Sequence, residues 1–417
     1  MCMIKSQILS LLILTVAILS ACASRVENEL KTFQIAVENT LDSEREDVFV
    51  HIPLESISGR YPDFNPKGYR VFHDGTEIPS QFNSDGLDKG LIVILPKVLP
   101  KEKILLELGY DSEKDIENNY PKRTQAELSH KFNGYFENRK YIGGEFRNVN
   151  ELHVPAEHTD HSWYIRYEGP GWESDKVRYR FYLDWRNGVD VFGKTVSEPI
   201  LRLVGQDGFD SYHEMQDWGM DVLKVGKTLG VGSIATFIDG KARRIDVTDS
   251  LYAAITNNGP VYSSVLTKYH GWDLGYTKTD ITSEISIHAG TRVSQQVLKS
   301  SGPIENFATG LIKDPKAELI MGGEAMKYGY LATYGPQSLA GDNLGIAVIF
   351  PNDRKMEITD DGLSHIVVLR PENHGVTYYF LAAWEQEKNG IKTKEQFIDH
   401  LNVVVNQLSN PVSVNLK

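Results

Sequence analysis

Short apolar stretches, many of them alternating with polar residues, recur along most of the chain. In the first quarter they occupy residues 33–38, 47–54, 68–72, 91–95 and 104–108, with turn dipeptides such as Asp74-Gly75 and Asp85-Gly86 between them. An alternation with a period of two places successive side chains on opposite faces of a β-strand. The spacing of strands and turns therefore predicts a small N-terminal β-sandwich over residues 28–112.

A polar segment with few apolar residues follows at 113–124 and is expected to be a linker. Further strand patterns occupy 179–185, 281–288, 345–350, 364–369 and 376–384, and Asn187-Gly188 predicts a hairpin turn. Many strands with few helices favour a mainly β chain over an α/β enzyme. We therefore expect residues 125–417 to form a large antiparallel β-sandwich of the supersandwich type.

One helix is predicted near the C-terminus. Residues 393–396 (TKEQ) match a capping box, in which Thr393 and Gln396 bond to each other's backbone amides. Phe397, Leu401, Val404 and Leu408 then recur at helical spacing, and Asn410-Pro411 ends the pattern. The apolar face of this helix is expected to pack on the large sandwich.

The N-terminal 21 residues read as a lipoprotein signal peptide. Lys5 precedes an apolar run at residues 8–19, and Leu19-Ser20-Ala21-Cys22 matches a bacterial lipobox. The run is shorter than the ~20 residues that span a bilayer, which disfavours a membrane-spanning anchor. We expect lipidation at Cys22 and, because no acidic export tag follows, an outer-membrane lipoprotein that faces the periplasm.

The net charge of −12 and the lack of a basic tract disfavour nucleic-acid binding. Cys2 and Cys22 are the only cysteines, so the processed chain is expected to form no disulfide and to use no cysteine nucleophile. An anionic ligand would need locally placed cations. Five arginines in the central block can supply them, or can pair with carboxylates across strands: Arg166, Arg178, Arg180, Arg186 and Arg202.

Residues 153–227 combine four histidines, four tryptophans, arginines and many carboxylates with glycines. Such a mixture is typical of a cleft for a polar, ring-shaped and anionic ligand, although an ordinary sheet with a decorated outer face is the alternative. His153, His158 and His161, with Asp160 or Glu157, are within reach of a shared zinc ion. Their spacing matches no established zinc motif, so no metal is predicted and a polar loop lining the cleft is favoured.

Tyr212 and His213 are the main candidates for acid/base chemistry, because His is the commonest proton-transfer group near neutral pH. Adjacent residues on a strand point to opposite faces, so the pair needs a loop, and Gly208 and Gly219 allow one. The alternative is a buried, hydrogen-bonded histidine with Trp218 as packing.

Two further candidates lie at predicted turns. Glu168 belongs to a tight turn and is suited to acid/base work or to a sugar hydroxyl. Arg186 ends a strand and can bind a substrate carboxylate with its guanidinium fork, or form a structural ion pair at the hairpin end.

In the segments YEGPGWESDKVRYRFYLDWRN (167–187) and GFDSYHEMQDWGMDVLKVGKTLGVG (208–232) the chain resembles the ulvan oligosaccharide dehydratases, lipoproteins of polysaccharide-degrading marine bacteria. The resemblance implies removal of water from the terminal uronic acid of an acidic oligosaccharide, which gives a 4,5-unsaturated uronate without any cofactor. A non-catalytic glycan-binding lipoprotein, and a polysaccharide lyase or mutarotase-like enzyme, are the alternatives.

This elimination needs a cation for the substrate carboxylate, a base for the C5 proton and an acid for the leaving C4 oxygen. Arg186 or Arg180, His213 and Tyr212 can fill these roles in that order. Glu168 and His161 are further catalytic candidates. The remaining predicted substrate contacts are two stacking rings and two polar groups: Trp172, Trp218, Asp217 and Tyr182.

Overall fold

The computed structural model describes residues 30–417. The predicted signal peptide and Cys22 lie outside the described residues. No helix in the described part is both long and apolar enough to cross a membrane.

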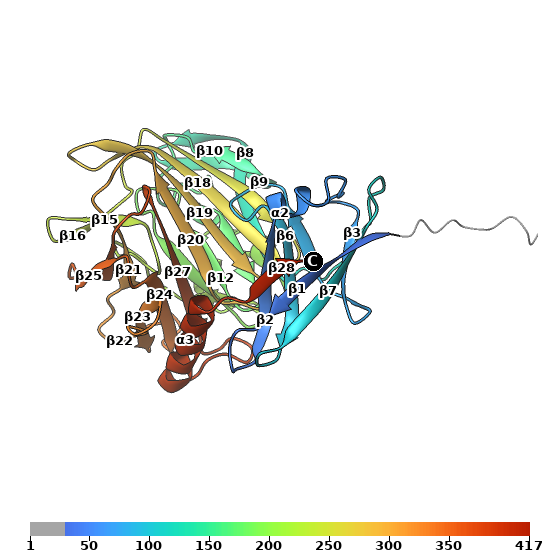
Figure 1. The fold of residues 1–417 in the computed structure, drawn as a ribbon. Helices are drawn as coiled ribbons and strands as arrows, with labels where there is room; N and C mark the ends of the chain where they lie inside the picture. Colours follow the sequence, from blue (N-terminus) through green and yellow to red (C-terminus); the bar gives the residue numbers. More distant parts are fainter. Residues whose placement is uncertain (1–29) are drawn as a thin grey trace, which may run out of the picture.

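An N-terminal module of two sheets forms one end of the molecule (Figure 1). Alternate apolar residues of its strands, such as Ile35 and Val50, fill a core of their own. The C-terminal strand pairs with the first strand, Ile35 opposite Leu416, so the chain ends in the module where it began. The first sheet has the order β28 (Ser413–Leu416), β1 (Lys31–Glu38), β7 (Lys103–Tyr110), β3 (Tyr69–His73) and β4 (Thr76–Glu77), and the second has β2 (Arg45–Pro53), β6 (Gly90–Val98) and β5 (Ser80–Asn83). The short helix α2 (Leu54–Ser58) follows β2.

The larger part of the molecule is built on a nine-stranded antiparallel sheet. A six-stranded and a five-stranded sheet contribute to the large core on one of its faces. In order, the nine strands are β10 (Glu151–His153), β17 (Ser250–Asn258), β18 (Tyr262–Asp273), β19 (Lys278–His288), β20 (Ser294–Ser300), β27 (Gly375–Trp384), β24 (Leu344–Pro351), β23 (Tyr328–Gly335) and β22 (Glu318–Gly322).

The six-stranded sheet carries two of the candidate site residues, Trp172 and Arg180, and the turns and loops beside its strands carry the others. Its strands are β14 (Gly219–Asp221), β13 (Val189–Lys194), β12 (Arg178–Phe181), β11 (Gly171–Ser174), β8 (Thr124–Glu137) and β9 (Lys140–Val149). Three 3-10 turns flank these strands: η1 (Arg166–Glu168), η2 (Leu201–Leu203) and η3 (Ser211–His213). The five-stranded sheet has the order β16 (Lys241–Arg244), β15 (Ala235–Ile238), β21 (Phe307–Ile312), β26 (Ser364–Leu369) and β25 (Lys355–Asp360).

Helix α3 (Lys394–Ser409) covers the other face of the nine-stranded sheet, next to the module (Figure 1). The Thr393 side chain accepts a hydrogen bond from the amide of Gln396, and the Gln396 side chain accepts one from the amide of Lys392. Phe397 and Leu401 are buried against the sheet. The prediction of a mainly antiparallel β fold with one C-terminal helix is confirmed.

One predicted strand is shorter than expected. The pattern at 179–185 predicts a strand through Trp185, but β12 ends at Phe181 and pairs with β13, Phe181 opposite Val189. Residues 182–188 form the connecting loop, in which Asn187 donates its amide to the carbonyl of Asp184 and has a φ of 41°. The hairpin is confirmed, but its loop is longer than the two-residue turn predicted at Asn187-Gly188.

Candidate functional site

Strands β12, β13 and β14 place a buried arginine between two buried carboxylates. Arg180 lies opposite Asp190 in the register, and Asp221 follows on the next strand. The Arg180 guanidinium donates from Nε and Nη2 to Asp190 Oδ2 at 3.0 and 2.7 Å, and from Nη2 to Asp221 Oδ2 at 2.6 Å. Nη1 donates to the hydroxyl of Tyr212 and Nη2 to that of Tyr182. All three nitrogens of Arg180 are therefore engaged within the protein.

A second arginine extends this layer through the hairpin loop. Arg186 donates to Asp184 from Nε at 2.9 Å and from Nη2 at 2.5 Å, and its Nη2 also donates to Glu168 at 2.6 Å. The other Glu168 oxygen is 4.0 Å from Arg180 Nη1, which joins the two arginines. Burial would raise the pKa of Glu168, but Arg186 and Arg180 together lower it below its ordinary value. We call Arg180, Arg186, Asp184, Glu168, Asp190 and Asp221 the arginine–carboxylate layer.

This pairing corrects the role predicted for the two arginines. Arg180 and Arg186 are buried and already bound to carboxylates of the protein, so they are not open cations that await a substrate carboxylate. The alternative, a structural ion pair at the hairpin end, describes Arg186. Burial also raises the pKa of Asp190 to about 6, with Asp221 adding to the shift.

His213 lies at the surface end of the layer. Its Nε2 is 3.3 Å from Asp221 Oδ2, and 45 % of its side chain is exposed. The Asp221 carboxylate raises the pKa of His213 above its ordinary value. The residue ends turn η3, which Gly208 and Gly219 flank with φ values of 130° and 122°. The loop that the sequence required for the Tyr212–His213 pair is thus present.

A second exposed histidine, His161, lies beside the layer on the loop that precedes η1. His161 has 64 % of its side chain exposed, and its Nδ1 is 3.5 Å from Asp160 and 3.9 Å from Glu168. Its backbone amide donates to Glu168 at 2.9 Å. The indole Nε1 of Trp185 donates a hydrogen bond to Asp160 Oδ1 at 3.0 Å. Burial acts to raise the pKa of Asp160, but hydrogen bonds lower it to about 2, and the bond from Trp185 has the largest effect among them.

Phe209 links the two histidines. Its ring meets the ring of His161 edge-on with centroids 5.4 Å apart, and that of Tyr212 with centroids 6.5 Å apart. The ring of His213 lies 4.7 Å from that of Tyr212. His161 and His213 therefore belong to one surface region above the arginine–carboxylate layer.

The loop that carries His161 is strained. His161, Trp163, Tyr167 and Glu168 have φ values of 57°, 57°, 40° and 73°, in a region that residues other than glycine rarely adopt. Such conformations cost on the order of 1–3 kcal/mol each and concentrate at functional sites. The strain supports a functional role for this loop.

The aromatic and tyrosine candidates take different places from those predicted. Trp172 is fully enclosed in the core, where its indole donates to Ser294 Oγ, so its predicted role as a stacking surface is wrong. Trp218 is 8 % exposed, and the Arg178 guanidinium lies 4.3 Å from its ring centroid. Trp185, which is not among the predicted site residues, is 40 % exposed beside Asp160.

Tyr212 is enclosed, with its hydroxyl bound to Arg180, and burial raises its pKa. It is therefore badly placed to protonate a substrate, contrary to prediction. Tyr182 is also buried, and its hydroxyl donates to Asp190. Asp217 is exposed on the turn between η3 and β14.

The three histidines considered for zinc do not converge. The ring of His153 packs on that of Tyr252 with centroids 4.9 Å apart. His158 Nδ1 forms a hydrogen bond of 2.8 Å with Ser162 Oγ. Burial lowers the pKa of His158 to about 4. Within residues 30–417, no group of three or more His, Cys, Asp or Glu side chains is arranged to hold a metal ion.

Comparisons with known proteins give a family but no activity. Residues 37–414 match the family described as "Domain of unknown function (DUF4861)". No curated protein matches the sequence. Among solved structures, a protein in the glycosyl hydrolase family 38 from Enterococcus faecalis matches with a TM-score of 0.45 and 10 % identity, over 93 % of this chain and 47 % of that one.

An alpha-mannosidase from Enterococcus faecalis V583 matches with a TM-score of 0.40 and 10 % identity, over 93 % of this chain and 46 % of the other. The chain thus spans about half the length of either protein. A likeness this distant carries no argument about what the chain does.

Proposed function

The chain belongs to the DUF4861 family, and we propose that it is an enzyme that eliminates water from the terminal uronic acid of an acidic oligosaccharide. One observation carries the proposal. His161 and His213 are both exposed, lie in one surface region, and each faces a carboxylate held by further bonds. Paired proton-transfer groups on a rigid support are what an elimination requires.

The surroundings of the two histidines support different roles. Because Asp221 raises the pKa of His213, this ring keeps its proton to a higher pH and is suited to protonate the leaving C4 oxygen. His161 faces Asp160 through Nδ1, which leaves Nε2 as an acceptor for the C5 proton. This assignment reverses the role predicted for His213 from the sequence, which was that of the base.

Groups at the surface provide for the rest of the substrate. Trp185 offers a partly open ring face against which a sugar can stack. Arg139 pairs with Asp160 at 3.1 Å while 73 % of its side chain stays exposed, so it can reach a substrate carboxylate. Together with protonated His213 it replaces the two buried arginines as the cation for the uronate.

The reaction is tested with uronate-ended oligosaccharides. The conjugated product absorbs in the near ultraviolet, and mass spectrometry shows the loss of one water. His213→Gln and His161→Gln should each lower the rate about 10²–10⁴-fold. His270→Gln is the matched control, because His270 is also half-exposed and lies 3.4 Å from Asp280, on another sheet.

Three outcomes contradict the proposal. Binding without any product indicates a glycan-binding protein, and shorter chains in the mass spectrum indicate a polysaccharide lyase. If His213→Gln and His161→Gln keep more than about a tenth of the rate, proton transfer belongs to other residues.

A further inference from the structure

A cavity lies away from His161 and His213, where the N-terminal module meets the rest of the molecule. It has a volume of about 930 Å³ and is lined by β2 of the module, β20 and β27 of the nine-stranded sheet, and helix α3. This volume lies in the range of about 300–1,000 Å³ that is usual for ligand sites. We call it the module cleft. None of its lining residues belongs to the arginine–carboxylate layer.

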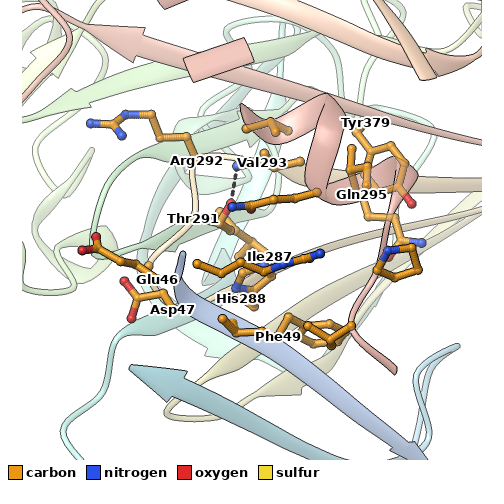
Figure 2. Close-up of a pocket in the computed structure, with 18 of the residues that line it drawn as sticks. Glu46, Asp47, Phe49, Ile287, His288, Thr291, Arg292, Val293, Gln295 and Tyr379 are labelled. Carbon is orange, nitrogen blue, oxygen red and sulfur yellow. Dashed lines mark hydrogen bonds between the residues drawn. The ribbon is translucent and has the colours of Figure 1, made fainter. Parts of the chain in front are cut away.

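Aromatic rings line the module cleft from two sides. Figure 2 shows Phe49 at its lower edge and Tyr379 at its upper edge, with Gln295 near Tyr379. The ring of Phe49 stacks on that of His288 with centroids 5.1 Å apart. The ring of Tyr379 packs edge-on against that of Tyr328, with ring centroids 5.7 Å apart. Phe49 and Tyr379 are partly exposed, so part of each ring is open to the cleft.

The charges of the cleft balance. Its lining holds four carboxylates and four cations. Several are already paired, since Arg292 donates to Glu387 at 2.8 Å and Arg123 donates to Asp47 at 2.8 Å. The formal charges of the lining therefore sum to zero, which gives the cleft no strong overall attraction for an ion of either sign.

The remaining polar groups are uncharged. Gln295 and Gln407 contribute amides, and Thr291 a hydroxyl. Burial lowers the pKa of His288, and that of His400 to about 4, which favours the uncharged form of both imidazoles. A neutral imidazole or an amide can both donate and accept a hydrogen bond, as a sugar hydroxyl can.

From this combination we propose that the module cleft binds an uncharged oligosaccharide, with its pyranose rings against Phe49 and Tyr379 and its hydroxyls on Gln295 and the neighbouring neutral groups. A pyranose has apolar ring faces and a rim of hydroxyls, which matches open aromatic faces beside uncharged donors and acceptors. The site is separate from the proposed elimination site and does not depend on that reaction.

Calorimetric titration of the protein tests this site. The probes are four neutral tetrasaccharides, built of glucose, mannose, galactose or xylose, with a tetrasaccharide of uronic acids as the charged comparison. At least one neutral probe should saturate the protein at a concentration up to the millimolar range. Phe49→Ala and Gln295→Ala should each weaken that binding by roughly tenfold or more.

Two controls separate the cleft from other causes. Tyr135→Ala removes a ring that is 58 % exposed on β8, outside the cleft, and should leave binding unchanged. His213→Gln should also leave it unchanged, so that the cleft and the elimination site are judged separately. Phe49→Ala could weaken binding by destabilising the N-terminal module, and Gln295→Ala tests the cleft without changing a residue of that module.

The proposal is overturned if no neutral tetrasaccharide binds. It is overturned equally if Phe49→Ala and Gln295→Ala both bind as tightly as the parent protein, or if only the charged tetrasaccharide binds and these substitutions weaken it.

Discussion

Replacing Arg180 with methionine tests whether the arginine–carboxylate layer is the support of the site. The side chain is buried, and its guanidinium is shared by Asp190 and Asp221 at 2.7 and 2.6 Å. Without it the two carboxylates stay buried with fewer partners. Removing one member of a buried ion pair costs about 3–5 kcal/mol, because the remaining charge is uncompensated. For a chain of this size we expect the unfolding temperature to fall by roughly 4–6 °C.

The penalty should depend on pH in a defined direction. Asp190 already has a pKa raised to about 6, and the loss of Arg180 raises it further. A carboxyl group with a raised pKa favours the folded state when protonated and disfavours it when ionised. Arg180→Met should therefore be close to the parent protein near pH 4 and lose stability as the pH rises through about 6 towards 8.

Lys278→Met is the matched control, since Lys278 lies 2.6 Å from Asp249 but both side chains are more than half exposed. An exposed pair contributes ~0–1 kcal/mol. Thermal unfolding followed by circular dichroism at pH 5 and pH 8 measures both variants. Our reasoning fails if Arg180→Met lies within about 1 kcal/mol of the parent at pH 8, or if its loss is the same at both pH values.

Three further predictions concern the two tryptophans, His213 and the lipobox cysteine. Trp172→Ala should lower the free energy of unfolding by about 3–5 kcal/mol in chemical denaturation, because the side chain is fully buried. Trp185→Ala should leave the free energy of unfolding nearly unchanged and raise KM in the elimination assay. The raised pKa of His213 stabilises the fold below about pH 6.5, a contribution lost as the pH rises through the raised value; His213→Gln should remove this part of the pH dependence in thermal melts at pH 6 and pH 9. Cys22→Ser should move the protein from the membrane fraction to the soluble fraction in cell fractionation, and equal membrane recovery would place the anchor elsewhere.

The sequence predicted the fold well where a single pattern decides it. The capping box at Thr393 and Gln396 determines where α3 begins, and alternation determines strands of the N-terminal module such as β2 and β7. In β24 and β27 the apolar run is continuous, and the structure gives the reason. Ile346 and Phe380 face the large core, while Ala347 and Leu381 face helix α3, so both faces of these strands are covered.

The sequence could not assign roles in the candidate site, because those roles depend on partners from other strands. Arg180 looks like a free cation until the register places Asp190 beside it and Asp221 on the following strand. Trp172 and Trp185 look equivalent, but one lies on a strand facing the core and the other on the loop of the hairpin. The early end of β12 at Phe181 decides that Trp185 is exposed.

The charge of the layer gives the strongest physical reason to expect proton chemistry at this surface. Two arginines face four carboxylates within it, so full ionisation would give the layer itself two more negative than positive charges, next to the buried Arg178. Burial, and then the neighbouring Asp221, raise the pKa of Asp190, while the hydrogen bond to Asp221 raises that of His213, so both groups keep a proton to a higher pH. His213 is the group of this pair that reaches the surface. In the proposed elimination, His213 is therefore the side chain at the surface end of the layer that delivers a proton to the substrate.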